Sequence, residues 1–237
     1  MNQQNNALFS LILSAIGGLF LSVLIVQTPI SPSMPSLPER IIISGMFIML
    51  CLLGMSLSLR PNWIKTMLKK KEPRKMNQQT AAQRSFIGHH PDCSVFDTHR
   101  IKYKKRIWCA GCVGVLIGCG AAIVLMTSAT ILSSQHPLLN PRALFFLGLL
   151  LVGFVFFELL LNNRFPLFHT ISNSLFIIAF FFVVEGVVEY TKNGIYGFFT
   201  ILICFLWLDT RIHLSQWRHN HVCQRCKEPC KMYPADR

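Results

Sequence analysis

Residues 143–161 read ALFFLGLLLVGFVFFELLL, and Glu158 is the only charged residue among them. A helix of about 20 apolar residues spans the roughly 30 Å hydrocarbon core of a bilayer, where it satisfies its own backbone hydrogen bonds. This stretch is therefore predicted to be a transmembrane helix.

Five further apolar stretches lie along the chain. They cover residues 8–26, 41–59, 107–132, 171–190 and 195–208. The last is short, and we expect its helix to continue through Leu214 into the membrane interface. The first has no Lys or Arg before it and no small-residue cleavage pattern, so it is predicted to be a retained helix rather than a secretion signal. The predicted fold class is all-α, a six-helix transmembrane bundle, with two spans in residues 1–59 and four in residues 107–209.

The overall composition agrees with a membrane protein. Hydrophobic residues make up 52% of the chain and charged residues 14%, whereas a soluble domain carries about a quarter charged residues. An ordinary cytosolic enzyme is therefore disfavoured, and the clustering of apolar residues excludes disordered, collagen-like and coiled-coil chains. The sequence holds no Gly-rich phosphate loop, His-Glu-x-x-His pair or serine nucleophile motif. Whether the protein is an enzyme stays open.

The basic residues predict how the chain is oriented. It has 23 Lys and Arg against 10 Asp and Glu, a formal net charge of +13. All Lys and Arg except Arg40, Arg142 and Lys192 fall on one side of a six-span topology, and cytoplasmic loops are the ones that accumulate these residues. Both termini, a basic loop of residues 60–106 and a tail of residues 210–237 are therefore predicted to be cytoplasmic, with the chain in the cell membrane.

The same charge indicates a lipid partner. The strip Lys69-Lys70-Lys71 follows the second span, and basic residues beside a span are attracted to anionic headgroups by about 1 kcal/mol each. The membrane explains the charge without nucleic acid, so we expect no nucleic-acid partner. A homo-oligomer or a membrane-protein partner stays open.

Six of the nine cysteines are predicted to lie on the cytoplasmic side beside histidines, whereas Cys51, Cys119 and Cys204 fall inside spans as small buried side chains. A reducing cytosol disfavours disulfides, and thiolate with neutral imidazole is the usual ligand set of tetrahedral zinc. A small cytoplasmic metal-binding module is therefore predicted. Its candidate ligands are His89, His90, Cys93, His99, Cys109, Cys112, His219, His221, Cys223, Cys226 and Cys230.

The number and kind of metal ions stay open. Two sites are possible, or one site shared between loop and tail, and either would staple the third span to the sixth. An iron–sulfur cluster is the alternative cofactor. Without metal, Cys109 and Cys112 at the start of a predicted helix could act as a redox dithiol in a membrane oxidoreductase, because a helix N-terminus and nearby basic residues favour thiolate.

One segment resembles a known group of proteins. His89-His90-Pro91-Asp92-Cys93, followed by Cys109-Ala110-Gly111-Cys112-Val113-Gly114, is similar to uncharacterised prokaryotic multi-pass membrane proteins in which a His/Cys segment leads into Cys-x-x-Cys-x-Gly at the head of a helix. The resemblance covers about residues 89–120 and implies a multi-pass topology with these cysteines at a span end. The tail cysteines depart from that pattern.

Charged residues inside spans suggest further sites, since they are costly in lipid. Glu185 is a candidate proton or cation site, whereas Glu189 is expected to pair with Lys192, three positions on. Glu158 is predicted to lie too far along the membrane normal from Glu185 to form a dyad with it. Asp209 precedes His213 by four residues, on a helical stripe that would either support a metal ligand or form an interfacial belt.

A stripe of small residues follows Cys112. Gly114, Gly118 and Ala122 recur at helical spacing. Such a stripe lets a neighbouring helix approach closely, so tight packing is predicted for this span.

Overall fold

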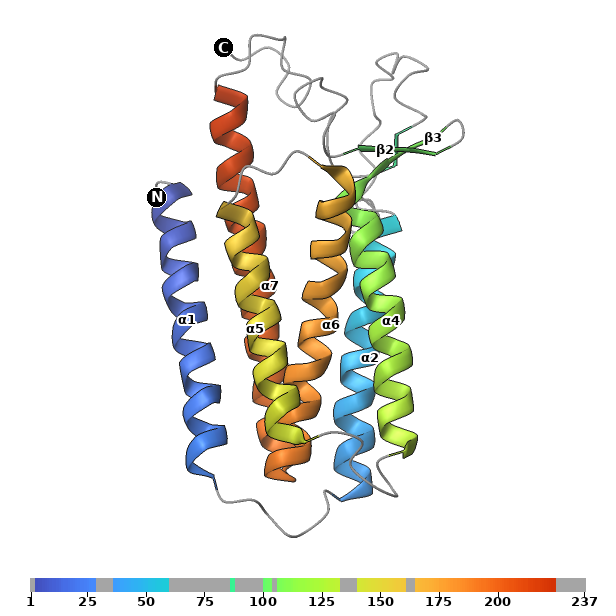
Figure 1. Ribbon diagram of the computed structural model, residues 1–237, viewed down its shortest axis with the longest axis vertical. Helices are drawn as coiled ribbons and strands as arrows, with labels where there is room; N and C mark the ends of the chain where they lie inside the picture. The colour runs from blue at the N-terminus through green and yellow to red at the C-terminus, as the bar shows by residue number, and fades with distance from the viewer. Residues whose placement is uncertain are drawn as a thin grey trace, which may run out of the picture.

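A computed structural model describes residues 3–28, 36–59, 86–87, 100–103, 106–132, 140–160 and 165–224. In this part of the chain there are six helices long and apolar enough to cross a membrane. They are α1 (Gln3–Gln27), α2 (Leu37–Leu59), α4 (Ala110–Leu132), α5 (Pro141–Leu160), α6 (Pro166–Thr191) and α7 (Gly194–Gln224). They run side by side along the long axis of the molecule (Figure 1). The prediction of six membrane-length helices is confirmed.

A small sheet, absent from the all-α prediction, caps one end of this bundle. Its strands are β1 (Phe86–Ile87), β2 (Arg100–Tyr103) and β3 (Arg106–Cys109), in the order β1-β3-β2. We call this the sheet end; the first residue of α1 and the last of α7 lie there too, and the start of α2 lies at the far end (Figure 1).

The sheet also changes where the third span begins. Residues 107–109 were predicted to be helical, but they pair as strand β3, and α4 begins at Ala110. Ile107 and Trp108 are β-branched and aromatic, the side chains that favour strands. Cys109 is therefore the last residue of a strand, and the predicted helical position is wrong for it.

Helix α6 lies at the centre of the bundle. It packs against α4, α5 and α7, and 67% of its most apolar stretch is buried inside the protein, against 22% for α1. The remaining helices present large apolar side chains outward, such as Phe20 of α1 and Leu150 of α5. The outer helices are therefore suited to lipid, and α6 is suited to a protein environment.

Glycines allow α4 and α6 to pack closely, as the small-residue stripe predicted. A Cβ at Gly118 would lie 2.8 Å from the carbonyl oxygen of Ser174, and one at Gly114 would lie 2.7 Å from Asn173 Cβ. The Ser174 hydroxyl donates to the Gly114 carbonyl at 2.9 Å. Close packing and hydrogen bonds between helices replace the hydrophobic effect, which is weak between helices in lipid.

Hydrogen bonds also hold α1, which packs mainly on α7. Ser14 Oγ lies 2.6 Å from Thr210 Oγ1, and the Trp207 indole donates to the Ser14 carbonyl at 3.1 Å. Ser10 Oγ lies 2.9 Å from His213 Nδ1. Helices α1 and α7, the first and last of the described part of the chain, are thus joined by polar contacts.

A pair of substitutions in α4 tests this packing. We expect Gly118→Val to lower stability by about 1–3 kcal/mol or more, because the added side chain would meet the α6 backbone. Gly120→Val is the matched control, since a Cβ there has nothing within 4 Å, and it should leave stability unchanged. Thermal unfolding of the two variants in detergent measures both effects; equal losses would contradict the close approach.

Candidate functional site

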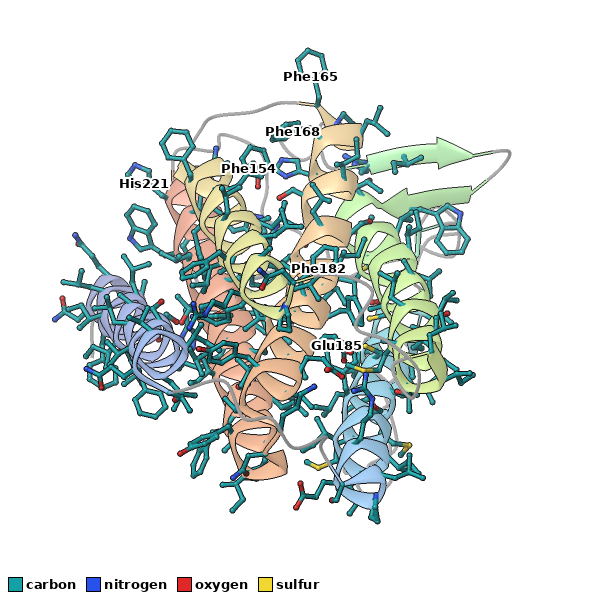
Figure 2. All side chains as sticks on the ribbon, turned by 60° about the horizontal axis from the view of Figure 1, so that its bottom comes forward. Phe154, Phe165, Phe168, Phe182, Glu185 and His221 are labelled. Atoms are coloured by element: carbon teal, nitrogen blue, oxygen red, sulfur yellow. The ribbon has the colours of Figure 1, made fainter. Side chains whose placement is uncertain are left out.

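Arg40 forms a buried charge network at the far end of the bundle. Its Nη2 lies 2.6 Å from Glu185 Oε1, and its Nη1 donates to Glu189 Oε1. Nη2 also donates to the Ala129 carbonyl of α4 at 3.1 Å. The guanidinium of α2 therefore joins α2, α4 and α6, and Figure 2 shows Glu185 on the side of α6 that faces α2.

Lys192 completes this network. Its Nζ lies 2.5 Å from Glu189 Oε2, which confirms the predicted pair. Burial, followed by the neighbouring charge of Arg40, lowers the pKa of Lys192. Two cations thus face two carboxylates, so the network is balanced when all four groups are ionised. Glu185 here has the surroundings of a fixed ion pair, and its predicted role as a proton or cation site stays a prediction.

Arg142 of α5 is the third basic residue at the far end. It donates to the Tyr190 hydroxyl, and its guanidinium lies 4.9 Å from the centre of that ring. The Tyr190 hydroxyl in turn donates to the Thr28 carbonyl at 2.8 Å. All three Lys and Arg residues of the less basic side therefore contact α6.

A second network surrounds Glu158, in the half of the bundle nearer the sheet. Glu158 is 0% exposed. Ser172 donates to its Oε2 at 3.0 Å, and His169 Nδ1 lies 3.3 Å from its Oε1. Arg211 Nη2 lies 4.0 Å from Oε2. Helices α5, α6 and α7 each contribute to this network.

The two networks are separate, as predicted for Glu158 and Glu185. Both networks include residues of α6. Ser172, which belongs to the Glu158 network, and Glu185, which belongs to the Arg40 network, are about 20 Å apart along the helix axis. Buried aromatic and branched apolar side chains fill the interval. They are Phe176, Phe180, Phe181, Val183 and Val184. An apolar layer therefore divides the interior into two polar regions.

Two predicted metal ligands lie where β3 meets α4. Cys109 is buried at the end of β3, and Cys112 is partly exposed in the first turn of α4. Ile87 of β1 pairs with Trp108, and Arg100 of β2 pairs with Cys109. His89, His90, Cys93 and His99 lie outside the described residues.

The other predicted ligands lie in the last turns of α7 or after its end. This helix carries His219 and His221 in its last turns, and Trp217 stacks on His221 with ring centres 6.3 Å apart. The Cys223 side chain, Cys226 and Cys230 lie outside the described part. The end of α7 lies at the sheet end but across the bundle from the sheet (Figure 1), and His221 shows the same separation in Figure 2.

Within the described residues, no group of three or more His, Cys, Asp or Glu side chains is arranged to hold a metal ion. Cys109 and Cys112 are near neighbours, whereas His219 and His221 are not brought to them. Asp209 Oδ2 lies 3.4 Å from His213 Nδ1, and that nitrogen contacts Ser10 of α1. This stripe joins helices, which fits an interfacial role better than support of a metal ligand.

Arg40, His169 and Arg211 were not predicted to be part of any site. Arg40 directly precedes an apolar span and was placed in a connection, whereas Arg211 was placed in the interfacial continuation of the sixth helix. The available signal was charge balance, because buried carboxylates in lipid require cations within reach. His169 lies two residues before the predicted span 171–190, and it contacts Glu158 of the preceding span.

Comparison with protein-family models, with curated proteins and with solved structures finds no match to this chain. The resemblance of residues 89–120 to multi-pass membrane proteins therefore stays a prediction.

The far-end network predicts how its members depend on each other. Arg40→Met should lower stability by about 3–5 kcal/mol, because buried Glu185 loses the guanidinium that pairs with it and Glu189 loses one of its two cations. Adding Glu185→Gln and Glu189→Gln to that variant should recover part of the loss. Chemical or thermal unfolding in detergent measures both steps, and Glu39→Gln, at an exposed carboxylate, serves as the control. A triple variant no more stable than Arg40→Met would contradict the ion-pair interpretation.

Proposed function

We propose that this multi-pass membrane protein binds zinc through its Cys/His segments at the sheet end. The ion would hold the basic loop and the tail against the bundle. The role of such a module is non-enzymatic, in transport, sensing or assembly. The register of the three-stranded sheet is the observation that supports the proposal.

The segment that carries the first set of ligands is anchored at both ends near Cys109. Strand β1 runs parallel to β3 and ends at Ile87, opposite Trp108, while β2 begins at Arg100, opposite Cys109. Neighbouring strands lie about 4.8 Å apart. Residues 88–99 therefore leave and re-enter the sheet beside the Cys109 end of β3, and His99 directly precedes Arg100.

The ligand chemistry fits a tetrahedral ion. Cys109 and Cys112 lie on the two sides of a strand-to-helix junction, and the thiolate is the form of cysteine that binds a metal ion. Two donors from His89, His90, Cys93 and His99 complete four ligands of the kinds that zinc prefers. The cysteines and histidines of the tail provide a second set, or they replace part of the first.

The proposed ion has a structural reason. The sheet has two-residue and four-residue strands, and a small sheet buries too little apolar surface to be stable alone. Structural zinc can provide most of the folding free energy of such a unit. Zinc at the junction would therefore fix the loop to α4.

The proposal includes the orientation of the chain. The start of α1 and the end of α7 both lie at the sheet end, which agrees with two termini on one side of the membrane (Figure 1). The positive-inside rule assigns the more basic side to the cytoplasm. A reducing cytosol keeps the cysteines reduced and therefore available as metal ligands. Anionic headgroups of the cell membrane would face the same basic loop.

Elemental analysis of the purified protein tests the metal. We expect at least one zinc per chain, lost in Cys109→Ser and kept in Cys204→Ser, whose thiol is buried in α7. Cys226→Ser distinguishes the two arrangements, because it abolishes binding at a shared site and removes only part of the zinc if the tail holds its own ion.

Two outcomes would overturn this assignment. Iron with broad visible absorbance would favour an iron–sulfur cluster and the oxidoreductase alternative. Metal-free protein whose cysteines cycle between dithiol and disulfide would remove the zinc proposal.

Reporter fusions test the orientation. Green fluorescent protein fused after Arg237 should fluoresce, and alkaline phosphatase at that position should be inactive, because the C-terminus is expected in the cytoplasm. Fusions after Gln135, in the connection between α4 and α5, should behave in the opposite way. Active phosphatase at the C-terminus would contradict the proposed orientation.

A further inference from the structure

We propose that Glu158 and His169 form a proton-binding site inside the bundle, with Arg211 as a fixed counter-charge. The site is independent of the proposed zinc module, since none of its groups is among the proposed metal ligands. Its ligand is a single proton held between a carboxylate and an imidazole.

The geometry leaves one carboxylate oxygen for that proton. Oε2 of Glu158 accepts the Ser172 hydroxyl at 3.0 Å. Among the described residues, Oε1 accepts no hydrogen bond and faces His169 Nδ1 at 3.3 Å. A buried acceptor without a hydrogen bond is costly, and the imidazolium, which carries a hydrogen on both ring nitrogens, ensures a donor on Nδ1 that can remove this cost.

The exchange involves one proton and no other reactant. In the loaded state, the proton lies on His169 Nδ1 and is donated to Oε1, or it has moved to Oε1 and left a neutral imidazole. In the unloaded state, Glu158 is a carboxylate and His169 is neutral. Imidazole is the side chain that ordinarily exchanges its proton between about pH 5 and pH 8.

The surrounding charges select a proton rather than a metal cation. From α7, Arg211 Nη2 approaches Glu158 Oε2 at 4.0 Å, and its guanidinium lies 4.9 Å from the centre of the Phe176 ring. Arg218, also on α7, donates to the Leu159 carbonyl at 2.5 Å. From α6, His169 and Ser172 face the carboxylate. A divalent ion at this carboxylate would meet the guanidinium charge of Arg211, whereas a proton has its own acceptor on the imidazole.

The proton has a short route from the sheet end. His169 lies in the first turns of α6, and its side chain is 12% exposed, whereas Glu158 is 0% exposed. His169 Nε2 is itself buried, so proton exchange with the interface requires a small opening near the start of α6, after which the imidazole passes the proton to the carboxylate. Beyond Ser172, the apolar layer of α6 prevents further transfer along the described interior. The site thus takes up and releases its proton from one side of the membrane.

Loading the site changes how α5 is held to α6. A protonated His169 places a positive charge beside the carboxylate and always carries a donor hydrogen on Nδ1. Without the proton, the imidazole donates to Oε1 only in the tautomer that has its hydrogen on Nδ1. The α5–α6 packing near the sheet end is therefore expected to tighten as the pH falls.

The test is a pH titration of the whole chain in nanodiscs. Its histidine rings carry an isotope label, and nuclear magnetic resonance monitors each ring as the pH changes. The His169 signal is assigned by its loss in His169→Gln and is expected to titrate between about pH 5 and pH 8. In Glu158→Gln its midpoint should move down by about one pH unit or more, a tenfold loss of proton affinity, because the imidazolium loses its carboxylate. A protonated-carboxyl infrared band, or its absence, shows which atom holds the proton.

Asp209→Asn is the matched control. It removes a carboxylate beside a different imidazole, 3.4 Å from His213 Nδ1, so it should leave the His169 midpoint in place. If Glu158→Gln does not fold, Glu158→Asp keeps the charge, lengthens the contact and should give a smaller downward shift. A His169 signal that stays neutral throughout, or a midpoint unchanged in both Glu158 variants, would overturn the proposal.

Discussion

A carboxylate enclosed by helices in a membrane must find its counter-charge within the protein, and this requirement determines how α6 is surrounded. Arg40 of α2 reaches Glu185 and Glu189 at one end, and Arg211 of α7 approaches Glu158 beside α6 at the other. Water would otherwise solvate these groups, and its absence makes an unpaired charge far more costly than the loss of an apolar contact. Helices α2, α5 and α7 are therefore fixed around α6 by charge as well as by shape.

The parts of the structure that rest on strong physical constraints could be predicted from the sequence. The six predicted apolar stretches correspond to six helices. In lipid, a single segment can satisfy its backbone N–H and C=O groups only by forming a helix. The close contact at Gly118 followed from residue size and spacing, and the pairing of Glu189 with Lys192 followed from helical periodicity. Arg40 could not be placed in the same way, because its partners are 145 and 149 positions away along the chain. The strand at Cys109 was missed because its apolar residues continue directly into a transmembrane stretch.

The division of the interior affects what the protein can do in this conformation. The apolar layer between Ser172 and Glu185 separates one polar region, which is closed by paired charges, from another that contains a titratable imidazole. Passage of an ion through the described core would require α6 to move relative to its neighbours. The glycines of α4 and α6 oppose such movement, since they allow close backbone contact over much of the helix. The two ends of α6 therefore differ in chemistry while belonging to one rigid element.

The packing of α1 on α7 bears on how the protein is made. Helix α1 is synthesised first, yet Ser10 and Ser14 find His213 and Thr210 only near the end of the chain. At a translation rate of about 5–20 residues per second, roughly 10–40 s pass before these partners leave the ribosome. During this interval we expect α1 to remain in lipid, with its serine hydroxyls bonded to its own backbone. The apolar exterior of α1 makes that delay tolerable, and assembly is complete only when the last helix inserts beside the first.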